Sequence, residues 1–335
     1  MLKKSSLYSF IILLIPLILN GQKSAEYLHD KPGKWILNQY SMNDSDPFHR
    51  NVKVVAEWFH QNVPVMTNPK GFDLWVYLTG YWDVKYKIQP GNYGRRCELN
   101  FDFRMFYREG GIRMVEPPHW SFEINNTEGG ISLLTRYVDF DNTKDAPELE
   151  KPLNKAAAEL NDLFKTFPYE REIIPGVRIY GPYLIVYNPD RPPFWIPVTV
   201  REVAEMKLAY NSLTEVHLLP FLKEEIAKLT EEELNAPAFS GNEKLFVLGV
   251  HPILEEKDKE SESGGQVMRF NPKYWDRTLP PTAIQFMTLY YPQRTQTETS
   301  DFYKYNGYPI FGDVVMNSIK VEELAGLIER KKLNY

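Results

Sequence analysis

The sequence predicts an α+β fold of two halves, each with antiparallel strands and segregated amphipathic helices. Apolar and polar residues alternate over 72–79 and 96–105, which is typical of half-buried strands. Apolar residues recur every three or four positions over 48–59 and 199–211, as in amphipathic helices. Helical and strand-like stretches are grouped, which favours segregated helices over a parallel α/β sheet.

The first 21 residues predict a secretory signal. Lys3 and Lys4 precede an apolar run over 7–19, and the small residue Gly21 follows. The run is shorter than the roughly 20 residues that a membrane-spanning helix needs. We therefore expect cleavage near Gly21 and a mature protein, secreted or periplasmic, without a transmembrane helix. The large side chain of Leu19 keeps an uncleaved anchor or a shifted cleavage site as the alternative.

The composition is typical of a packed, mildly acidic globular protein. The chain of 335 residues is 43% hydrophobic and 14% aromatic, with 44 acidic and 39 basic residues. This balance argues against a nucleic-acid partner. Cys97 is the only cysteine, so no intramolecular disulfide can form. Its place among the apolar positions of the strand over 96–105 predicts a buried, unreactive thiol.

The first half, 22–145, begins with a helix and continues as an antiparallel meander. Asp46 followed by Pro47 is typical of a helix start, and Pro64 lies just beyond the expected end near residue 62. Strands are expected over 72–79, 96–105, 112–125 and 131–140.

The second half, 146–335, follows a charged stretch with two prolines over 141–152. Helices are expected over 153–167, 199–211, 214–235 and 321–332, with a break at Pro220. Strands are expected within 176–190, 243–254 and 282–291.

The stretch 188–206 resembles a binding motif, but its residues predict a junction between a strand and a helix. Pro192, Pro193 and Pro197 lack backbone donors, so the chain there can be extended only at a sheet edge or unpaired. Thr199 and Glu202 have the spacing of a capping box. We expect Trp195 to pack at the base of the following helix.

Short motifs of common catalytic and cofactor sites are absent from the sequence. It contains no G-x-S-x-G, H-E-x-x-H, G-x-x-x-x-G-K-[ST] or G-x-G-x-x-G, and its histidines lack metal-ligand spacing. We therefore expect no cofactor and no metal, and we assign no catalytic residue. The acidic stretch 139–150 partly matches a calcium loop, but Lys144 stands where that loop requires glycine, which favours a solvated linker.

Three aromatic residues of the first long strand region are the candidates for ligand binding: Trp75, Tyr77 and Trp82. Trp75 and Tyr77 share the face opposite the apolar set, and exposed aromatics can stack on sugar rings or form partner interfaces. The interpretation that we favour for these aromatics is a sheet buried on both faces, for instance under the helix over 47–62, because large aromatics are mostly buried.

These observations predict an exported, non-enzymatic module that binds a small molecule, a glycan or a protein partner through a cleft between its halves. The first alternative is an extracytoplasmic hydrolase, for example of glycans, whose carboxylate pair is set by the fold and not by a local motif. The second alternative is a structural component of an envelope assembly. Whether the protein is an enzyme stays open at this stage.

Overall fold

The computed structural model describes the chain from residue 28 onward, with gaps. The described residues are 28, 30–38, 41–82, 93–108, 119–127, 131–132, 147–149, 152–153, 156, 160, 163–167, 169–181, 183–241, 245–253, 265–290 and 318–328. They combine helices with antiparallel and mixed sheets, which confirms the predicted α+β class.

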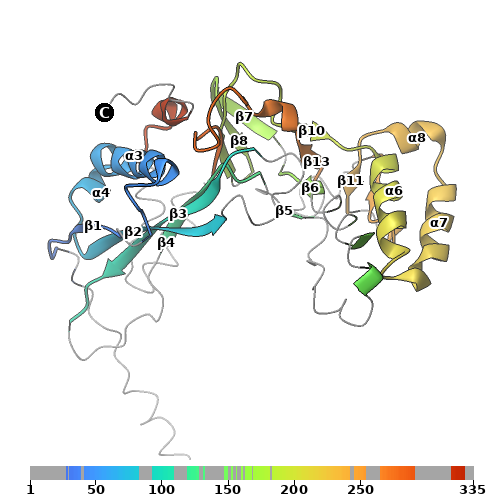
Figure 1. Cartoon of the computed structure of the whole chain (residues 1–335), viewed down its shortest axis with the longest axis horizontal. Coiled ribbons are helices and arrows are strands. Elements are labelled where there is room, and N and C mark those ends of the chain that lie inside the picture. Colours follow the sequence, from blue (N-terminus) through green and yellow to red (C-terminus); the bar gives the residue numbers. More distant parts are fainter. Residues whose placement is uncertain are drawn as a thin grey trace, which may run out of the picture.

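An eight-stranded sheet lies at the centre of the described structure (Figure 1). Its strand order is β1-β2-β3-β4-β14-β9-β8-β7, and its neighbouring strands are antiparallel except for β1 and β2. The strands are β1 (Trp35–Leu37), β2 (Phe72–Trp82), β3 (Arg96–Met105), β4 (His119–Ile124), β7 (Tyr169–Ile174), β8 (Val177–Tyr180), β9 (Tyr183–Val186) and β14 (Met287–Tyr290).

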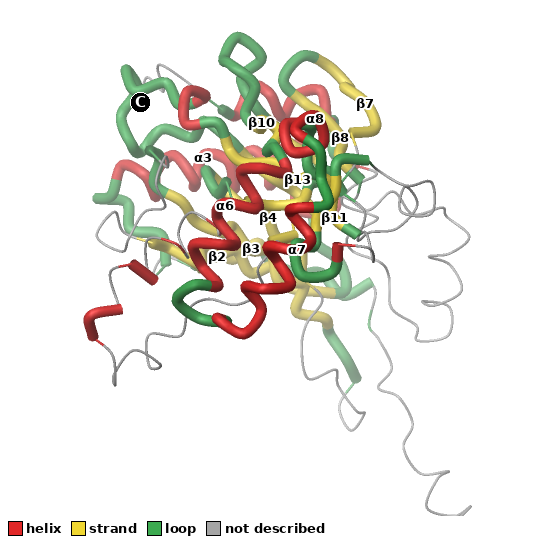
Figure 2. Tube along the Cα trace, turned by 90° about the vertical axis from the view of Figure 1, so that its right-hand side faces the viewer, coloured by secondary structure: helices red, strands yellow, loops and turns green. Residues whose placement is uncertain are grey.

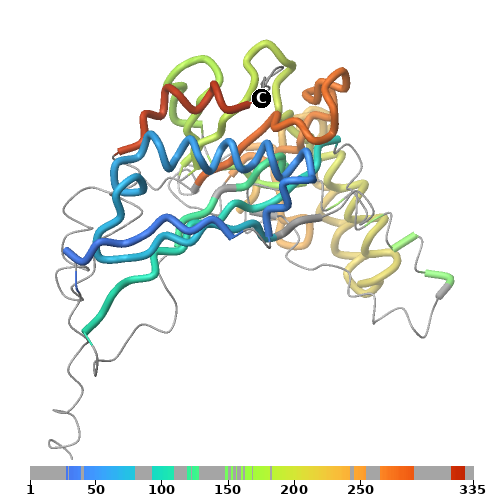
Figure 3. The backbone as a smooth tube through the Cα atoms, turned by 60° about the vertical axis from the view of Figure 1, so that its left-hand side comes forward, coloured from blue at the N-terminus to red at the C-terminus, as the bar shows by residue number. Residues whose placement is uncertain are grey.

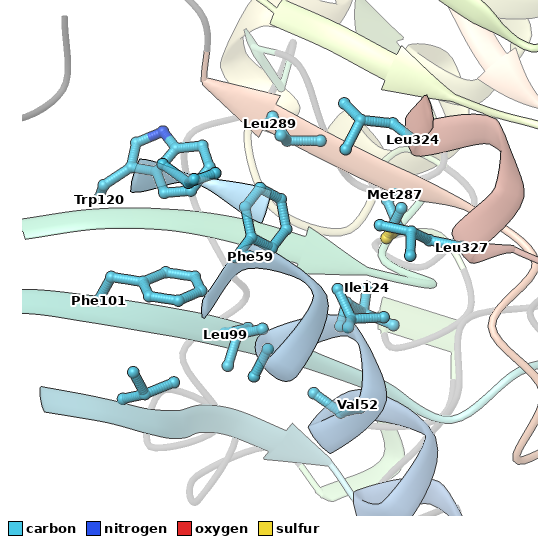
Figure 4. Packing of buried hydrophobic residues seen from close by; sticks show 14 of the residues in the cluster. Val52, Phe59, Leu99, Phe101, Trp120, Ile124, Met287, Leu289, Leu324 and Leu327 are labelled. Carbon is cyan, nitrogen blue, oxygen red and sulfur yellow. The ribbon is translucent and has the colours of Figure 1, made fainter. Parts of the chain in front are cut away.

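One face of this sheet carries the main core. Helix α3 (Pro47–Asn62) and the 3-10 helix η6 (Val321–Leu327) lie side by side on it (Figure 3). The Phe59 ring of α3 lies 5.7 Å from that of Phe101 and 5.3 Å from that of Trp120. Burial of one such side chain contributes about 1.5–3 kcal/mol. Figure 4 shows this packing for Val52, Phe59, Leu99, Phe101, Trp120, Ile124, Met287, Leu289, Leu324 and Leu327.

The predicted start of α3 is confirmed. The Asp46 carboxylate accepts a hydrogen bond of 2.8 Å from the Phe48 backbone N–H, and Pro47 is the first helical residue. Arg95, just before β3, donates two hydrogen bonds of 2.8 Å to the same carboxylate. The helix ends at Asn62, and Pro64 opens the short helix α4 (Pro64–Thr67). One carboxylate thus fixes α3 to the start of β3.

A second layer lies at the right of Figure 1 and contains a four-stranded sheet of order β10-β13-β6-β5, a two-stranded sheet β11-β12 and several helices. Helices α6 and α7 run side by side (Figure 2) and bury an aliphatic cluster that includes Val203 and Leu222. The elements are β5 (Ile131–Ser132), β6 (Leu163–Lys165), β10 (Trp195–Pro197), β11 (Phe239–Ser240), β12 (Val250–His251), β13 (Val267–Phe270), α6 (Val200–Asn211), α7 (Leu219–Ala227), α8 (Glu231–Asn235), and the 3-10 helices η2 (Pro147–Leu149), η3 (Val216–Leu218) and η5 (Pro272–Tyr274).

The junction predicted within 188–206 is confirmed. β10 is an edge strand of the four-stranded sheet, as its prolines require. Thr199 Oγ1 accepts from the Glu202 N–H at 3.2 Å, and the Glu202 carboxylate accepts from the Thr199 N–H at 2.8 Å. Trp195 is buried, but its ring lies 5.3 Å from those of Phe164 and Tyr180, in a cluster separate from the one that α6 buries. The expected packing of Trp195 at the base of α6 was therefore wrong.

An aromatic cluster joins the second layer to the large sheet, on the face opposite α3. Ile185 of β9 and Phe286 next to β14 pack there with residues of the second layer such as Phe194 and Phe270. Beside it, the fully buried Asn125 connects β4 with residues 283–286. Its side chain donates to the carbonyls of Arg95 and Ala283 and accepts from the N–H groups of Gln285 and Phe286.

Strands from both sides of residue 146 share the large sheet, because β4 precedes this residue whereas β9 and β14 follow it. The large sheet therefore contains strands from both of the expected segments, 22–145 and 146–335. The division of the chain into these two segments stays a prediction.

Some expected elements were wrong in type or place. β5 leaves the first-half meander and pairs with β6 in the second sheet. Residues 163–165, expected within a helix, form β6, and residues 245–248, expected in a strand, form a helical turn. The C-terminal helix is of the 3-10 type over its described part. Short apolar runs suit a buried strand or a buried helix equally, so periodicity alone cannot separate them.

Other predictions fall outside the described residues. They include the signal peptide with its cleavage near Gly21, the residues at the ligand positions of the calcium-like loop (Asp139, Asp141, Thr143, Asp145 and Glu150), and parts of the strands expected over 112–125 and 131–140. Among the described helices, none combines the length and the apolar character that crossing a bilayer requires.

Candidate functional site

Trp75 and Tyr77 lie on the face of β2 that points away from α3. Their neighbours Leu74 and Val76 belong to the core under that helix, and side chains alternate along a strand. The interpretation that α3 buries these aromatics is therefore wrong. Both side chains are half-buried.

Trp82 is the last residue of β2. Its backbone pairs with that of Arg96 after a register shift that follows Thr79. The side chain of Trp82 lies outside the described part of the structure, so its role in ligand binding stays a prediction.

Each of the two placed aromatics has a polar partner on β3. The guanidinium of Arg104 lies 3.6 Å from the centre of the Trp75 ring, in a cation–π contact. The Tyr77 hydroxyl donates a hydrogen bond of 2.9 Å to Asp102 Oδ1. Burial, and then this bond to a carboxylate, raise the pKa of Tyr77 to about 12, so the hydroxyl stays protonated and can donate. Both rings are thus held in place.

A second polar network follows one step further along the same strands. Asn100 Nδ2 donates to Thr79 Oγ1 at 2.6 Å, and the Thr79 hydroxyl donates to Glu98 Oε2 at 3.1 Å. Asn100 is 6% exposed and Asp102 is 8% exposed. A sheet face that only meets water exposes its polar residues, so the burial of these two side chains is unusual for the face opposite the core.

We call this surface the polar aromatic face and define it by Trp75, Tyr77, Thr79, Glu98, Asn100, Asp102 and Arg104. It continues onto β4, where Glu123 lies opposite Glu98 and the exposed His119 lies opposite Asp102. Within the described part of the chain, no three histidine, cysteine or acidic side chains are grouped to hold a metal ion. The face presents carboxylate, amide, hydroxyl and guanidinium groups beside two aromatic rings.

Sequence reasoning found Trp75 and Tyr77 but missed their β3 partners. Alternation placed Glu98, Asn100 and Asp102 on one side of a strand, which is the signal that could have suggested them. The sequence alone does not give the register of β2 against β3, which places Trp75 opposite Asp102.

Three other aromatic residues and the single cysteine are buried away from this face. Trp120, Tyr274 and Trp275 are buried, and the first of these packs under α3. Cys97 is buried in the main core, where loss of solvent raises the pKa of its thiol. A thiol in this state is a poor nucleophile.

Comparison of the chain with protein-family models, curated proteins and solved structures finds no match.

Proposed function

We propose that the protein is an exported binding module and that its polar aromatic face binds an oligosaccharide. The observation that carries this proposal is that two of the three candidate aromatics are held by polar partners, Trp75 by Arg104 and Tyr77 by Asp102. Aromatic rings stack on the apolar faces of sugars, and carboxylate and amide oxygens accept hydrogen bonds from hydroxyl groups. Both kinds of contact are present on one surface.

The placement of these residues supports a role in binding over a role in packing. The core of β2 and β3 is already filled from the other face by residues such as Leu74 and Phe101. Side chains that are fixed before binding lose less conformational entropy when a ligand arrives. The rings of Trp75 and Tyr77 meet this condition through their β3 partners.

Binding to a panel of neutral, amino and acidic oligosaccharides, followed by calorimetry, tests the proposal. Trp75→Ala should weaken binding by about tenfold or more, as expected for a central aromatic contact. The matched control is Tyr169→Ala, which removes an aromatic that is 53% exposed on the edge strand β7. Equal affinities for the two variants, both folded, would refute the assignment of the face.

Export is the second part of the proposal and rests on the charged and apolar pattern of residues 1–21. Intact-mass measurement of protein recovered outside the cytoplasm should give a chain that begins at or near Gln22. Full-length chain in the membrane fraction would contradict cleavage.

A hydrolase is the second candidate, because Glu98 and Glu123 stand directly opposite each other on β3 and β4. Side chains paired in this way have Cβ atoms about 4.5–5.5 Å apart. Glycosidases use two carboxyl groups that flank the scissile bond. Sugar release by the wild-type protein that Glu98→Gln and Glu123→Gln both abolish would support this candidate, whereas binding without turnover supports the binding module.

A further inference from the structure

A polar row crosses three strands at the end of the polar aromatic face. Glu98 of β3 pairs with Glu123 of β4, and Glu123 pairs with Thr288 of β14. Their chain neighbours Leu99, Ile124 and Met287 belong to the core on the other face, so the three side chains share the face of Tyr77. We call Glu98, Glu123 and Thr288 the acidic row.

Within the acidic row, Thr288 provides the evidence for a bound ligand. Thr288 is 4% exposed, and its hydroxyl has no hydrogen-bond partner among the residues that the structure describes. Buried hydroxyl groups almost always have a partner, because leaving one without a partner costs about 1–3 kcal/mol. The buried hydroxyl next to Glu123 is therefore suited to a ligand group that the structure does not contain.

The two carboxylates define the charge of that group. A positively charged donor would form charge-assisted hydrogen bonds with carboxylates placed in this way, and such bonds are about twice as strong as neutral ones. The row offers two carboxylates and one hydroxyl, whereas Ca²⁺ takes about six to eight oxygen ligands, so the row suits an organic cation better than a metal ion.

The acidic row and the aromatic rings lie within the reach of one sugar chain along β2. Thr79, which pairs with Glu98, lies four residues beyond Trp75 on the same strand. Four residues of a strand span about 13 Å, which suits an oligosaccharide better than a single sugar. A sugar chain stacked on Trp75 and Tyr77 can thus reach the acidic row.

We infer that the ligand is an amino sugar oligomer whose protonated amine binds the acidic row. This inference rests on the proposed function, because the same face must bind the sugar rings. It also predicts that oligosaccharides with carboxylate groups bind poorly, since the row would repel them.

Calorimetry with three soluble probes tests the inference: a β-1,4-linked glucosamine trisaccharide, its N-acetylated form and cellotriose. The measurements are made at mildly acidic pH, where the amine is charged and ordinary carboxylates stay ionised. The wild-type protein should bind the glucosamine trisaccharide about tenfold more tightly than cellotriose, as expected for one charge-assisted hydrogen bond. High salt should reduce this preference.

Variants test whether the acidic row causes the preference for the glucosamine trisaccharide over cellotriose. Glu98→Gln and Glu123→Gln should each remove most of it while binding of cellotriose persists. Thr288→Val should reduce the preference without lowering the melting temperature, because the hydroxyl that it removes has no partner. The control Glu232→Gln removes an equal charge from the exposed start of α8 and should change nothing.

The outcomes separate this inference from the proposed function. Equal wild-type affinities for the charged and neutral probes, or a preference that survives both Gln variants, would overturn the amine site. The proposed function would then stand only if Trp75→Ala still weakens cellotriose binding. If the wild-type protein binds none of the three probes, both the amine site and the oligosaccharide proposal are overturned.

Discussion

Thr199 and Glu202 hold the first turn of α6 through two reciprocal hydrogen bonds, and Glu202 also accepts a bond of 2.7 Å from Arg269 of β13. This single pair therefore joins a helix start to the sheet beneath it. Thr230 and Glu233 form the same capping box at α8, but α8 is only five residues long and Thr230 is exposed.

Thr199→Ala should lower the free energy of unfolding by about 0.5–2 kcal/mol, because it leaves an N–H group of the first turn without its acceptor. The corresponding fall in melting temperature is about 2–8 °C for a domain of ordinary size. Thr230→Ala is the matched control and should have the smaller effect. Thermal unfolding followed by circular dichroism measures both, and a larger effect at Thr230 would contradict this view of the two caps.

Cys97 gives a second prediction at the residue scale. Because burial raises the pKa of its thiol, the folded protein should not react with a thiol reagent, and reaction should follow unfolding. Labelling across a denaturant series measures this. Fast labelling of the native protein would show that the core over β3 opens more readily than the packing suggests.

At the scale of elements, α3 depends on one charged contact at its start. Burial alone would raise the pKa of Asp46, but hydrogen bonds from Arg95 and from the Phe48 N–H outweigh burial and lower it below its usual value. The folded protein therefore binds this proton less readily than the unfolded chain. The contact contributes stability above the unfolded pKa of about 3.9, and that contribution is lost as the pH falls through the lower, folded pKa.

Asp46→Asn should weaken this dependence, because an amide can still accept the helix N–H but carries no charge for Arg95. Urea unfolding between neutral and acidic pH should show the wild-type free energy falling more steeply in acid than that of the variant. Parallel curves for the two proteins would mean that Asp46 does not titrate as the geometry requires.

The elements that the sequence predicted well are those with long, regular patterns and clear ends. Asp46, Pro47 and Pro64 mark both ends of α3, and alternation over ten residues marks β3. The segments at 163–165 and 245–248 are short and apolar, and their structure depends on partners distant in the chain. β6 is a strand because β13 pairs with it.

At the scale of the whole molecule, Asn125 connects the first meander to the segment before β14. Its left-handed backbone, with φ of 53°, and its four side-chain hydrogen bonds exist only when both parts are folded. Asn125→Ala leaves buried backbone groups without partners and should lower the free energy of unfolding by about 3 kcal/mol or more. Urea unfolding measures it, and a loss below about 1 kcal/mol would show that the two parts are joined mainly by apolar contacts.

The candidate site could be predicted only in part, for a reason at this same scale. Alternation within β2 identifies Trp75 and Tyr77, but the pairing of Trp75 with Asp102 and of Glu98 with Glu123 depends on strand register. Thr288 reaches the face from β14, far along the chain, by pairing with β4. Single-strand patterns contain no information about such neighbours.

The central claim is that the polar aromatic face binds sugar, and the indole N–H signals of the seven tryptophans test it most directly. The Trp75 signal can be assigned from a Trp75→Phe variant and followed by NMR during titration with the glucosamine trisaccharide. The Trp75 signal should shift until saturation, while that of Trp120, buried in the main core on the other face, stays in place. A bound trisaccharide that leaves Trp75 unmoved and shifts other tryptophans would contradict the claim.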